Sequence, residues 1–289
     1  MDEAGGHHVA IDDTRLFVVE RGAGTPIIVL HGGPGLDHHE FADYLDPLAE
    51  RCRLILVDQR SQGRSDPTPE HTWTLERMSQ DVIMLARAME LDGYVVLGHS
   101  FGAFVALQNA VDYPRQAIAT IVSCGVPSMR YLDKVDEHLR AFEPAGLREQ
   151  VTDSWAREAD ARTSAEFESI IRDQCPFHFA DPLDPRIEGY AARSAGVLTP
   201  DVLRHFSGEG SDGIEVEDRL AEITTPVLVL GGRHDRTCVV QAAEATAAAI
   251  PGAELVVFER SGHMPFVEET EAYLAAVGAF VDRVTDQVG

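Results

Sequence analysis

Hydrophobic residues along this chain gather into short continuous runs, and between those runs they recur every three or four positions. Continuous apolar runs of this kind are typical of strands buried on both faces of a parallel sheet. Six runs fit the description: TPIIVLHGG, RLILVDQR, YVVLG, QAIATIVSCG, TPVLVLGG and ELVVFER. Alternating apolar and polar residues near 7–12 and 14–20 predict, in addition, a hairpin at the N-terminus.

The segments between the runs carry the periodicity of amphipathic helices. The clearest predicts a helix from about 74 to 91 that ends at Asp92-Gly93. Its apolar residues are Leu75, Met78, Val82, Leu85 and Met89. Further helices are expected at SFGAFVALQNAV and near 240–250. Strands that alternate with single helices predict an α/β fold with a mostly parallel sheet and right-handed crossovers.

Two other helices are predicted from shorter patterns. A short helix is expected to carry Phe41, Leu45 and Leu48 toward the sheet. A final helix is expected to have one apolar face, formed by Val267, Leu274, Val277 and Val281.

Between about residues 128 and 220 the pattern changes. This stretch is polar and helix-prone, and it contains no run typical of a buried strand. We therefore expect a helical cap at 128–220, inserted into a core formed by 1–127 and 221–289. No internal repeat or low-complexity linker separates the two parts, so they are expected to fold as one unit.

The composition suits a folded protein that does not bind polyanions. The chain has 289 residues, of which 44% are hydrophobic, and a formal net charge of −24. This charge repels phosphate backbones and anionic lipids, so we expect neither nucleic acid nor membrane as a partner. The N-terminus has no apolar run, and no later stretch is apolar over the ~18 residues of a membrane span, which predicts a cytoplasmic protein.

Cysteines and paired histidines are residues that can form metal or redox sites. The four cysteines are far apart, which favours reduced and buried thiols over disulfides or a zinc site. The pairs His7-His8 and His38-His39 have no partner at metal-ligand spacing, so we interpret them as surface histidines. We expect neither a metal nor a cofactor. The cysteines are Cys52, Cys124, Cys175 and Cys238.

A candidate nucleophile lies in the sequence GHSFG at 98–102, which fits the G-x-S-x-G motif between the strand YVVL and an apolar helix. In that context Ser100 occupies a sharp turn, and the glycines two positions before and after it avoid collisions with the neighbouring strand and helix. The start of the helix also favours negative charge that develops there. Ser100 is therefore predicted to be a nucleophile, with a plain glycine-bracketed turn as the alternative.

A serine nucleophile needs a base, and with this motif an acid and then a histidine follow along the chain. Asp235 comes three residues after TPVLVLGG, and His263 comes three residues after ELVVFER. Both positions belong to the carboxyl edge of the expected sheet, where Ser100 also lies. His263 is the only one of twelve histidines that follows Asp235, whereas His234 precedes it and is interpreted as a loop residue. The nearest rival acid is Asp133.

Acyl transfer also needs hydrogen-bond donors for the oxyanion of its tetrahedral intermediate. The backbone N–H of Phe101, the residue after the nucleophile, is one expected donor. The loop HGGPG at 31–35 follows the strand TPIIVL and makes the N–H of Gly33 the expected second donor. Its three glycines would let a substrate approach closely, although they would equally suit a tight turn.

With these residues the chain resembles the α/β-hydrolase superfamily over nearly its whole length, and within it the prolyl aminopeptidase (proline iminopeptidase) family. The narrower resemblance is carried by HGGPG at 31–35 and DQRSQGRSD at 58–66, with Ser61 where the family usually has Gly. The resemblance implies an α/β-hydrolase fold with an inserted helical cap. It also implies the same site residues, namely Ser100, Asp235 and His263 as the triad and Gly33 and Phe101 as the oxyanion hole.

The chain departs from that family at positions that bear on the substrate. Its elbow is GHSFG, where prolyl aminopeptidases usually have GGSWG or a close aromatic variant, and His99 is shared with many esterases. Family members bind the free amino group of the substrate through cap glutamates. Glu158 and Glu209 are the candidates here, with solvated surface glutamates as the alternative. Some members have an acid directly after the triad Asp, where this chain has Arg236.

Several arginines lie near the expected site in sequence. If they faced the pocket, they would suit a carboxylate-bearing ester or lactone better than a free amine. Surface salt bridges on an acidic protein are the alternative. The arginines are Arg60, Arg64, Arg233 and Arg236.

Three functions follow from these patterns. The leading prediction is a serine hydrolase that forms an acyl-enzyme, most similar to a proline iminopeptidase, and acts on small molecules or short peptides with an aminoacyl amide. A carboxylesterase or lactonase acting on a small ester is the enzymatic alternative. A ligand-binding protein that keeps the fold without turnover is the non-enzymatic alternative.

Overall fold

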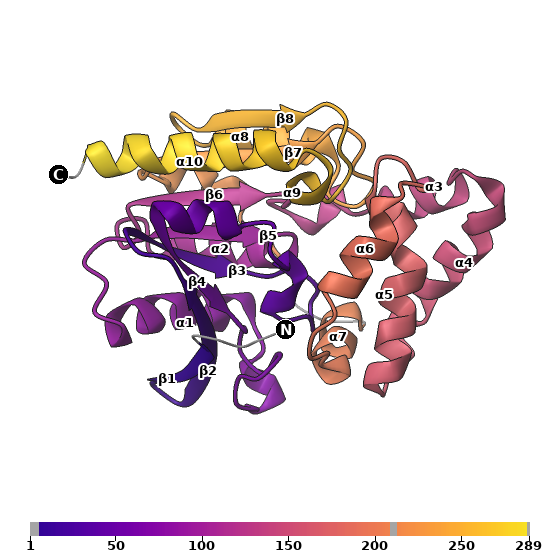
Figure 1. Ribbon diagram of the computed structural model, residues 1–289, viewed down its shortest axis with the longest axis horizontal. Coiled ribbons are helices and arrows are strands. Elements are labelled where there is room, and N and C mark those ends of the chain that lie inside the picture. The colour runs from indigo at the N-terminus through magenta and orange to yellow at the C-terminus, as the bar shows by residue number, and fades with distance from the viewer. Residues whose placement is uncertain (1–5, 209–212, 288–289) are drawn as a thin grey trace.

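An eight-stranded sheet forms the centre of the molecule in the computed structural model, which describes residues 6–208 and 213–287 (Figure 1). Its strands are β1 Gly6–Ile11, β2 Thr14–Arg21, β3 Thr25–Leu30, β4 Cys52–Val57, β5 Val95–His99, β6 Ala119–Ser123, β7 Val227–Gly232 and β8 Glu254–Phe258. They lie in the order β1-β2-β4-β3-β5-β6-β7-β8. β2 pairs antiparallel with β1 and β4, and the remaining neighbours pair in parallel. The hairpin and the six predicted strands are therefore all present, and β8, at the edge of the sheet, is only partly buried.

Four helices cover the two faces of this sheet: α1 Leu75–Ala88, α2 Phe101–Asp112 and α8 Val240–Ala249 on one face, and α10 Thr270–Asp286 on the other. Successive strand residues point to opposite faces, so each strand contributes to both hydrophobic layers. In β3, Ile28 and Leu30 pack with the first three helices, whereas Ile27 and Val29 pack with α10. Burial on both faces explains why the strands appear in the sequence as continuous apolar runs.

The predicted helix at 74–91 is present as α1, but it ends before the predicted residue. Thr74 caps its N-terminus by accepting a hydrogen bond from the N–H of Arg77 at 3.1 Å. The helix gives way at Met89, and Glu90 has a φ of +52°, which a right-handed helix does not allow. Asp92-Gly93 therefore follows the end of the helix by several residues.

The prediction of one short helix through Phe41, Leu45 and Leu48 was wrong. The chain forms two short 3₁₀ helices there, His38–Phe41 and Asp46–Glu50. Ala42 interrupts them with a φ of +45°, and Pro47 has no N–H to donate to a preceding turn. All three apolar side chains are nevertheless buried, as the spacing predicted.

The predicted final helix is divided into two parts. Val267 belongs to α9, Pro265–Glu268, and the other three residues of the predicted apolar face belong to α10. The break occurs at Glu269, whose φ of −131° and ψ of 51° are not helical. There the Glu269 carboxylate accepts hydrogen bonds from the N–H of Arg260 at 2.9 Å and from the hydroxyl of Ser261 at 2.8 Å. The break thus lets an acidic side chain turn back and hold the loop after β8.

Among the described residues between β6 and β7, five α-helices stand together beside one end of the sheet (Figure 1). They are α3 Val135–Arg140, α4 Ala145–Ala156, α5 Ser164–His178, α6 Arg186–Arg193 and α7 Pro200–Ser207. Small clusters of their own side chains, such as Phe142, Val151 and Phe177, stabilise them. We propose, as the sequence predicts, that these inserted helices form the cap at 128–220. Within the described residues, no helix is long and apolar enough to span a bilayer.

The inserted helices also contact the loop that follows β3. The N–H of Thr199 donates to the carbonyl of Gly35, and the N–H of Val197 donates to the Asp37 carboxylate, both at 2.8 Å. These bonds join residues 197–199 to the glycine-rich loop at 31–35 and the turn that follows it. The helices are therefore attached to the core through backbone hydrogen bonds as well as side-chain packing.

Candidate active site

Ser100 lies on the turn between β5 and α2 in a backbone conformation that few residues other than glycine adopt. Its φ is +53° and its ψ is −118°. Its N–H donates to the carbonyl of Ser123 on β6 at 2.9 Å, which fixes the turn to the neighbouring strand. A Cβ atom on Gly98 would overlap the backbone of Gly102, and one on Gly102 would overlap the carbonyl of Leu30. The two glycines therefore allow the turn that presents Ser100 to a cavity.

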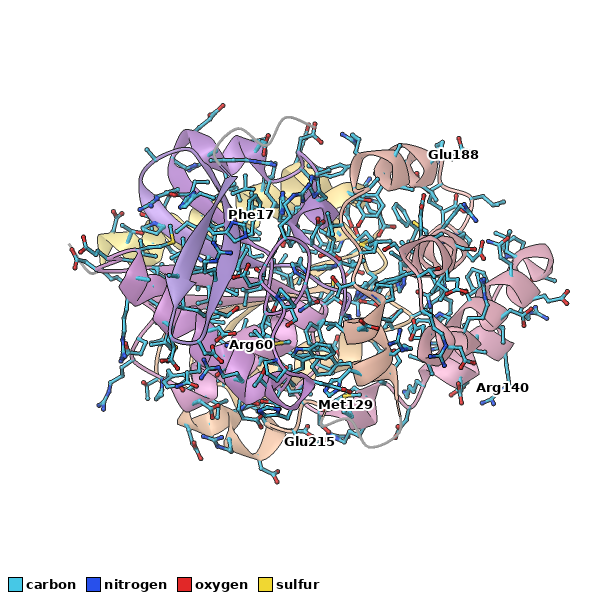
Figure 2. All side chains as sticks on the ribbon, turned by 90° about the horizontal axis from the view of Figure 1, so that it is seen from below. Phe17, Arg60, Met129, Arg140, Glu188 and Glu215 are labelled. Carbon is cyan, nitrogen blue, oxygen red and sulfur yellow. The ribbon has the colours of Figure 1, made fainter. Side chains whose placement is uncertain are left out.

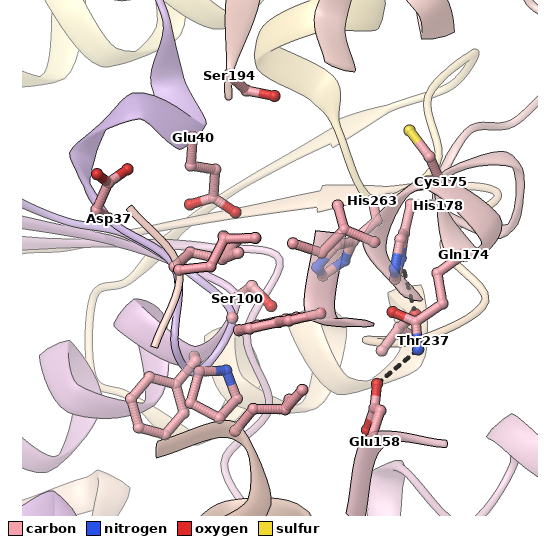
Figure 3. A pocket seen from close by; sticks show the side chains of 18 of the residues that line it. Asp37, Glu40, Ser100, Glu158, Gln174, Cys175, His178, Ser194, Thr237 and His263 are labelled. Carbon is pink, nitrogen blue, oxygen red and sulfur yellow. Dashed lines mark hydrogen bonds between the residues drawn. The ribbon is translucent and has the colours of Figure 1, made fainter. Parts of the chain in front are cut away.

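Asp235 and His263 form a buried pair on the loops that follow β7 and β8. His263 Nδ1 lies 2.7 Å from Oδ2 of Asp235, so the carboxylate accepts the Nδ1 proton and leaves Nε2 for chemistry. The other carboxylate oxygen accepts the N–H groups of Thr237 at 2.8 Å and Cys238 at 2.9 Å. Ser100 and His263 line the same cavity, and Figure 3 shows them as neighbours on its wall.

Two opposing effects set the pKa of His263. Burial disfavours the imidazolium form, whereas the charge of Asp235 and its hydrogen bond favour that form. The second effect prevails, and the pKa of His263 is raised above its ordinary value. A base of this kind accepts a proton more readily than a free imidazole does.

Two other histidine rings flank His263. The ring of His99 lies 5.0 Å from it and that of His178 lies 5.1 Å from it, between centroids. Burial, and then the charge of His263, hold the pKa of both neighbours well below its ordinary value. They are therefore neutral near pH 7, and His263 is the ring of the three that can take up a proton.

Phe101 and Gly33 occupy positions suited to oxyanion donors. Both line the cavity, and Phe101 is the first residue of α2, where backbone N–H groups have no partner within the helix. Among the described residues, no group accepts a hydrogen bond from either N–H. Gly33 has a φ of +105° and precedes Pro34 through a cis peptide bond. A glycine suits that conformation, because a side chain would be strained there.

The cavity has a volume of about 640 Å³ and lies between the carboxyl edge of the sheet and the inserted helices. This size suits a small molecule or a short peptide. Apolar side chains form much of its lining, among them Leu75, Phe104, Trp155, Phe167, Leu203 and Phe206. The charged residues of the lining, apart from histidines, are Asp37, Glu40, Glu158, Glu168 and Arg172. Carboxylates thus outnumber cations, which favours a positively charged ligand group over a negative one.

The four arginines near the site in sequence do not line the cavity. Arg236 donates hydrogen bonds to the backbone carbonyls of Phe177, Phe179 and Ala180 at 3.1, 2.6 and 3.1 Å. It therefore holds the end of α5 and the residues after it. The interpretation that these arginines could face the pocket and bind a substrate carboxylate was wrong.

The remaining arginines of this set pair with acidic residues. Arg60, labelled in Figure 2, is 1% exposed. It pairs with Asp81 at 2.7 Å and with Asp13 at 2.8 Å. Arg233 pairs with Glu259 at 2.8 Å on the surface. Arg64 lies 3.4 Å from the Asp37 carboxylate. The pair of Arg233 agrees with the alternative of surface salt bridges, whereas Arg60 forms a buried ion pair that this alternative did not include.

Glu158, one of the two cap glutamates expected from the resemblance, lines the cavity. Its carboxylate accepts hydrogen bonds from the Gln174 amide at 2.6 Å and the Ser207 hydroxyl at 3.1 Å, the first of which Figure 3 shows. Burial raises the pKa of Glu158. Glu209 lies outside the described residues.

The rival acid and base do not reach the cavity. Asp133 and His234 are both exposed and neither belongs to its lining. His234 is a loop residue, as the sequence predicted, and its N–H donates to the carbonyl of Ser261 at 2.9 Å. The structure therefore brings together Ser100, Asp235 and His263 without a competing acid or base from these two positions.

Sequence reasoning missed Glu40, a buried carboxyl group in the wall of the cavity. Its Oε2 accepts the N–H of Gly32 at 2.5 Å, and burial raises the pKa of Glu40 to about 7. The available signal was its place directly before the apolar Phe41 and shortly after the HGGPG loop. An acidic residue in such a position needs a partner or a role.

His38 and His39 are not surface histidines, so that interpretation was wrong. His38 is buried and its Nδ1 lies 2.6 Å from Asp58, while Nδ1 of His39 lies 2.9 Å from Asp37. Asp37, His38 and His39 bring ligand atoms close enough together for a metal ion. The Nδ1 atoms of His38 and His39 already take part in the hydrogen bonds to Asp58 and Asp37. All four cysteines are buried and unpaired thiols, as expected.

The chain is similar to known hydrolases. It matches the family described as the alpha/beta hydrolase fold over residues 25–270. It is 30% identical to a proline iminopeptidase of Heyndrickxia coagulans over 273 residues, which cover 92% of this chain and 93% of that protein. The crystal structure of a proline iminopeptidase of Mycobacterium smegmatis covers 98% of this chain and 100% of its own, at 23% identity and a TM-score of 0.79. An esterase from Exiguobacterium antarcticum covers 96% and 99%, at 23% identity and a TM-score of 0.76.

Proposed function

This chain belongs to the α/β-hydrolase fold family, and we propose that it is a serine hydrolase that works through an acyl-enzyme. The observation that carries the proposal is the pair formed by His263 and Asp235, 2.7 Å apart, on the wall of the cavity that Ser100 also lines. In this proposal Ser100 is the nucleophile, His263 the general base and Asp235 the residue that orients the base and stabilises its charged form.

The proposed reaction uses these groups in turn. His263 Nε2 takes the proton of the Ser100 hydroxyl as its oxygen attacks the substrate carbonyl carbon. The resulting oxyanion receives hydrogen bonds from the N–H groups of Gly33 and Phe101, each worth about 2.7–4 kcal/mol of transition-state stabilisation. The intermediate collapses, His263 protonates the leaving amine or alcohol, and the acyl group stays on Ser100. Water, activated by His263, then releases the acyl group by the same steps.

A small aminoacyl amide is the substrate class that the cavity favours. Such a substrate carries a free ammonium group beside its scissile carbonyl, and the charged lining of the cavity is dominated by carboxylates. The resemblance to proline iminopeptidases supports the same class. We therefore propose an N-terminal aminopeptidase activity, with an aminoacyl group such as prolyl or alanyl on the acyl side.

Hydrolysis of a small ester is the second candidate activity. The lining of the cavity is largely apolar, and the same nucleophile, base and oxyanion donors would cleave an ester. A carboxylate-bearing ester is disfavoured, because carboxylates outnumber the single arginine of the lining, Arg172, and Arg60, Arg64, Arg233 and Arg236 do not line the cavity.

Two assays test the proposal. A fluorophosphonate probe should label the wild-type protein and fail to label Ser100→Ala; equal labelling of both would reject Ser100 as the nucleophile. The protein should cleave prolyl and alanyl arylamides, and its activity on them is compared with its activity on p-nitrophenyl acetate and butyrate. Cleavage of the esters alone would replace the aminopeptidase with an esterase.

A further inference from the structure

We infer that Glu40 is the specificity-determining residue for a free α-amino group, which its carboxylate binds beside Ser100. The inference rests on the proposed serine hydrolase function and adds an anchor that comes from the loop after β3. It differs from recognition by the inserted helices, because Glu40 belongs to the part of the chain that carries the oxyanion loop.

The position of the Glu40 carboxylate suits the amine of an acyl substrate. A Cβ atom on Gly32 would lie 2.7 Å from Glu40 Oε1 and 3.0 Å from Ser100 Cβ, so that oxygen lies close to the nucleophile. In an aminoacyl substrate the amino group is bonded to the carbon next to the carbonyl that Ser100 attacks. The ammonium group must therefore also lie within a few ångströms of Ser100. Figure 3 shows Glu40 on the same side of the cavity as Ser100.

Glu40 has an oxygen that remains available for a ligand. Its Oε2 accepts the N–H of Gly32, which orients the carboxylate, whereas among the described residues no group donates to Oε1. Glu40 is 4% exposed and lines the cavity, so this oxygen meets the interior of the cavity rather than bulk water. A carboxylate oriented in this way loses little side-chain freedom when it binds a cation.

The other carboxylates of the lining are less suited to the same task. Both oxygens of Glu158 accept hydrogen bonds from Gln174 and Ser207. Both oxygens of Asp37 accept hydrogen bonds from the chain, among them those of His39 and Val197. Glu168 is exposed on α5, where water screens its charge.

Among the described residues, no arginine or lysine pairs with the Glu40 carboxyl group, and His263 is the cationic group that acts on it. Burial raises the pKa of Glu40 to about 7 against the smaller lowering effect of the His263 charge, so the chain supplies only part of the positive charge that the ionised carboxylate needs. A substrate ammonium would supply that positive charge and favour the ionised carboxylate. For a neutral acyl group, the same ionised carboxylate would lie close to the developing oxyanion and oppose it. Glu40 thus favours acyl groups with an α-amine and disfavours those without one.

Glu40→Gln tests this inference with a matched pair of substrates, alanyl and propionyl 7-amino-4-methylcoumarin amide, which differ in the amine. Gln keeps an oxygen to accept the Gly32 N–H, so the fold should persist. We expect the ratio of kcat/KM for alanyl over propionyl to fall about 10- to 100-fold, the usual effect of losing a buried charged hydrogen bond. Turnover of p-nitrophenyl propionate should be equal or faster. Glu188→Gln, which changes an exposed carboxylate on α6 outside the lining of the cavity, is the control and should leave the ratio unchanged.

Several outcomes would overturn the inference. An unchanged ratio in Glu40→Gln would do so, as would a loss of preference in Glu158→Gln with none in Glu40→Gln. A wild-type protein that the fluorophosphonate probe labels, but that shows no preference for the alanyl substrate, would reject Glu40 and leave the serine hydrolase intact. No labelling at all would reject the proposed function itself. If Glu40→Gln does not fold, Glu40→Asp, which withdraws the carboxylate from Ser100 by one methylene, should lower the same ratio.

Discussion

The backbone N–H of His263 donates a hydrogen bond to the carbonyl of His178 at 2.6 Å. His178 is the last residue of α5, so the bond joins an inserted helix directly to the loop that carries the candidate base. Glu268 strengthens the connection by accepting the N–H groups of Gly262 and Ala180, both at 2.8 Å. The candidate base is therefore positioned by residues from two distant parts of the chain.

Substitutions in the proposed triad should have unequal effects. Ser100→Ala and His263→Ala should each lower kcat about 10⁶-fold, because the two groups act as one unit. Asp235→Asn should lower kcat about 10⁴-fold and leave measurable turnover. Steady-state kinetics with the best arylamide or ester substrate, at equal protein purity, measure these effects. Wild-type activity in any of the three variants would refute the role assigned to that residue.

The acid side of the pH profile should report on His263. The base works in its neutral form, and because its pKa is raised, kcat/KM should decline as pH falls through a midpoint above 6.5. In Asp235→Asn the midpoint should move to lower pH, because the carboxylate that stabilises the imidazolium is gone. Profiles of kcat/KM between pH 5 and 9 test both statements. A flat wild-type profile down to pH 5 would contradict the assignment of the base.

The two glycines of the elbow should tolerate no side chain. Gly98→Ala and Gly102→Ala place a methyl group against backbone atoms that cannot move aside, so each should destabilise the fold by several kcal/mol or prevent folding. Gly189→Ala is the control, because nothing lies within 4 Å of its Cβ position on α6. It should be neutral or stabilising by up to about 1 kcal/mol. Thermal unfolding measures the stability of the three variants. A Gly98→Ala variant as stable as the wild-type protein would contradict the described turn.

Arg236 should affect kcat but not the preference between neutral and carboxylate-bearing substrates. Arg236→Met removes the donors to three carbonyls between 177 and 180, which should displace His178 and lower kcat with both aminoacyl and ester substrates. The preference between a neutral ester and a carboxylate-bearing ester of similar size should stay unchanged. A selective loss of the carboxylate-bearing substrate would instead indicate that Arg236 contacts it.

The stability contributed by Glu40 should depend on pH. Its pKa is about 7 in the folded chain, against an ordinary value of 4.5, so the folded state retains a proton that the unfolded state has lost over that range. This contribution is complete below about pH 4.5 and is lost as pH rises through 7. Gln does not titrate, so the free energy of unfolding of Glu40→Gln relative to wild type should rise by about 2–3 kcal/mol from pH 5 to 8. Urea unfolding at both pH values measures the difference, and a constant difference would contradict a buried, titrating carboxyl.

The strands and the elbow were predictable because their signals are local. A buried parallel strand is a continuous apolar run, and a glycine two positions on either side of Ser100 is visible in the sequence itself. The order of strand ends then indicated Asp235 and His263. The structure places these two residues in hydrogen-bond contact.

Features that depend on distant parts of the chain were not predictable in the same way. The division of the last helix at Glu269 reflects its bonds to Arg260 and Ser261, which no helical periodicity contains. Burial of His38 depends on Asp58 from the next strand's loop. The direction of Arg236 depends on carbonyls nearly sixty positions away in the chain. Sequence spacing indicated which residues lie near the site, but tertiary packing decides which of them enter it.

The attachment of the inserted helices has a consequence for engineering by recombination. Residues 177–180 bond to the His263 loop and to Arg236, and residues 197–199 bond to the loop that carries Gly33. A chimaera that exchanged this insertion with that of a relative would therefore replace residues that hold both the proposed base, His263, and the loop of the proposed oxyanion donor Gly33. The segment from within α5 to within α7 contains both anchors, so it should be kept from the parent. Exchange of only the parts of the insertion before and after this segment should preserve catalysis while part of the cavity wall is varied.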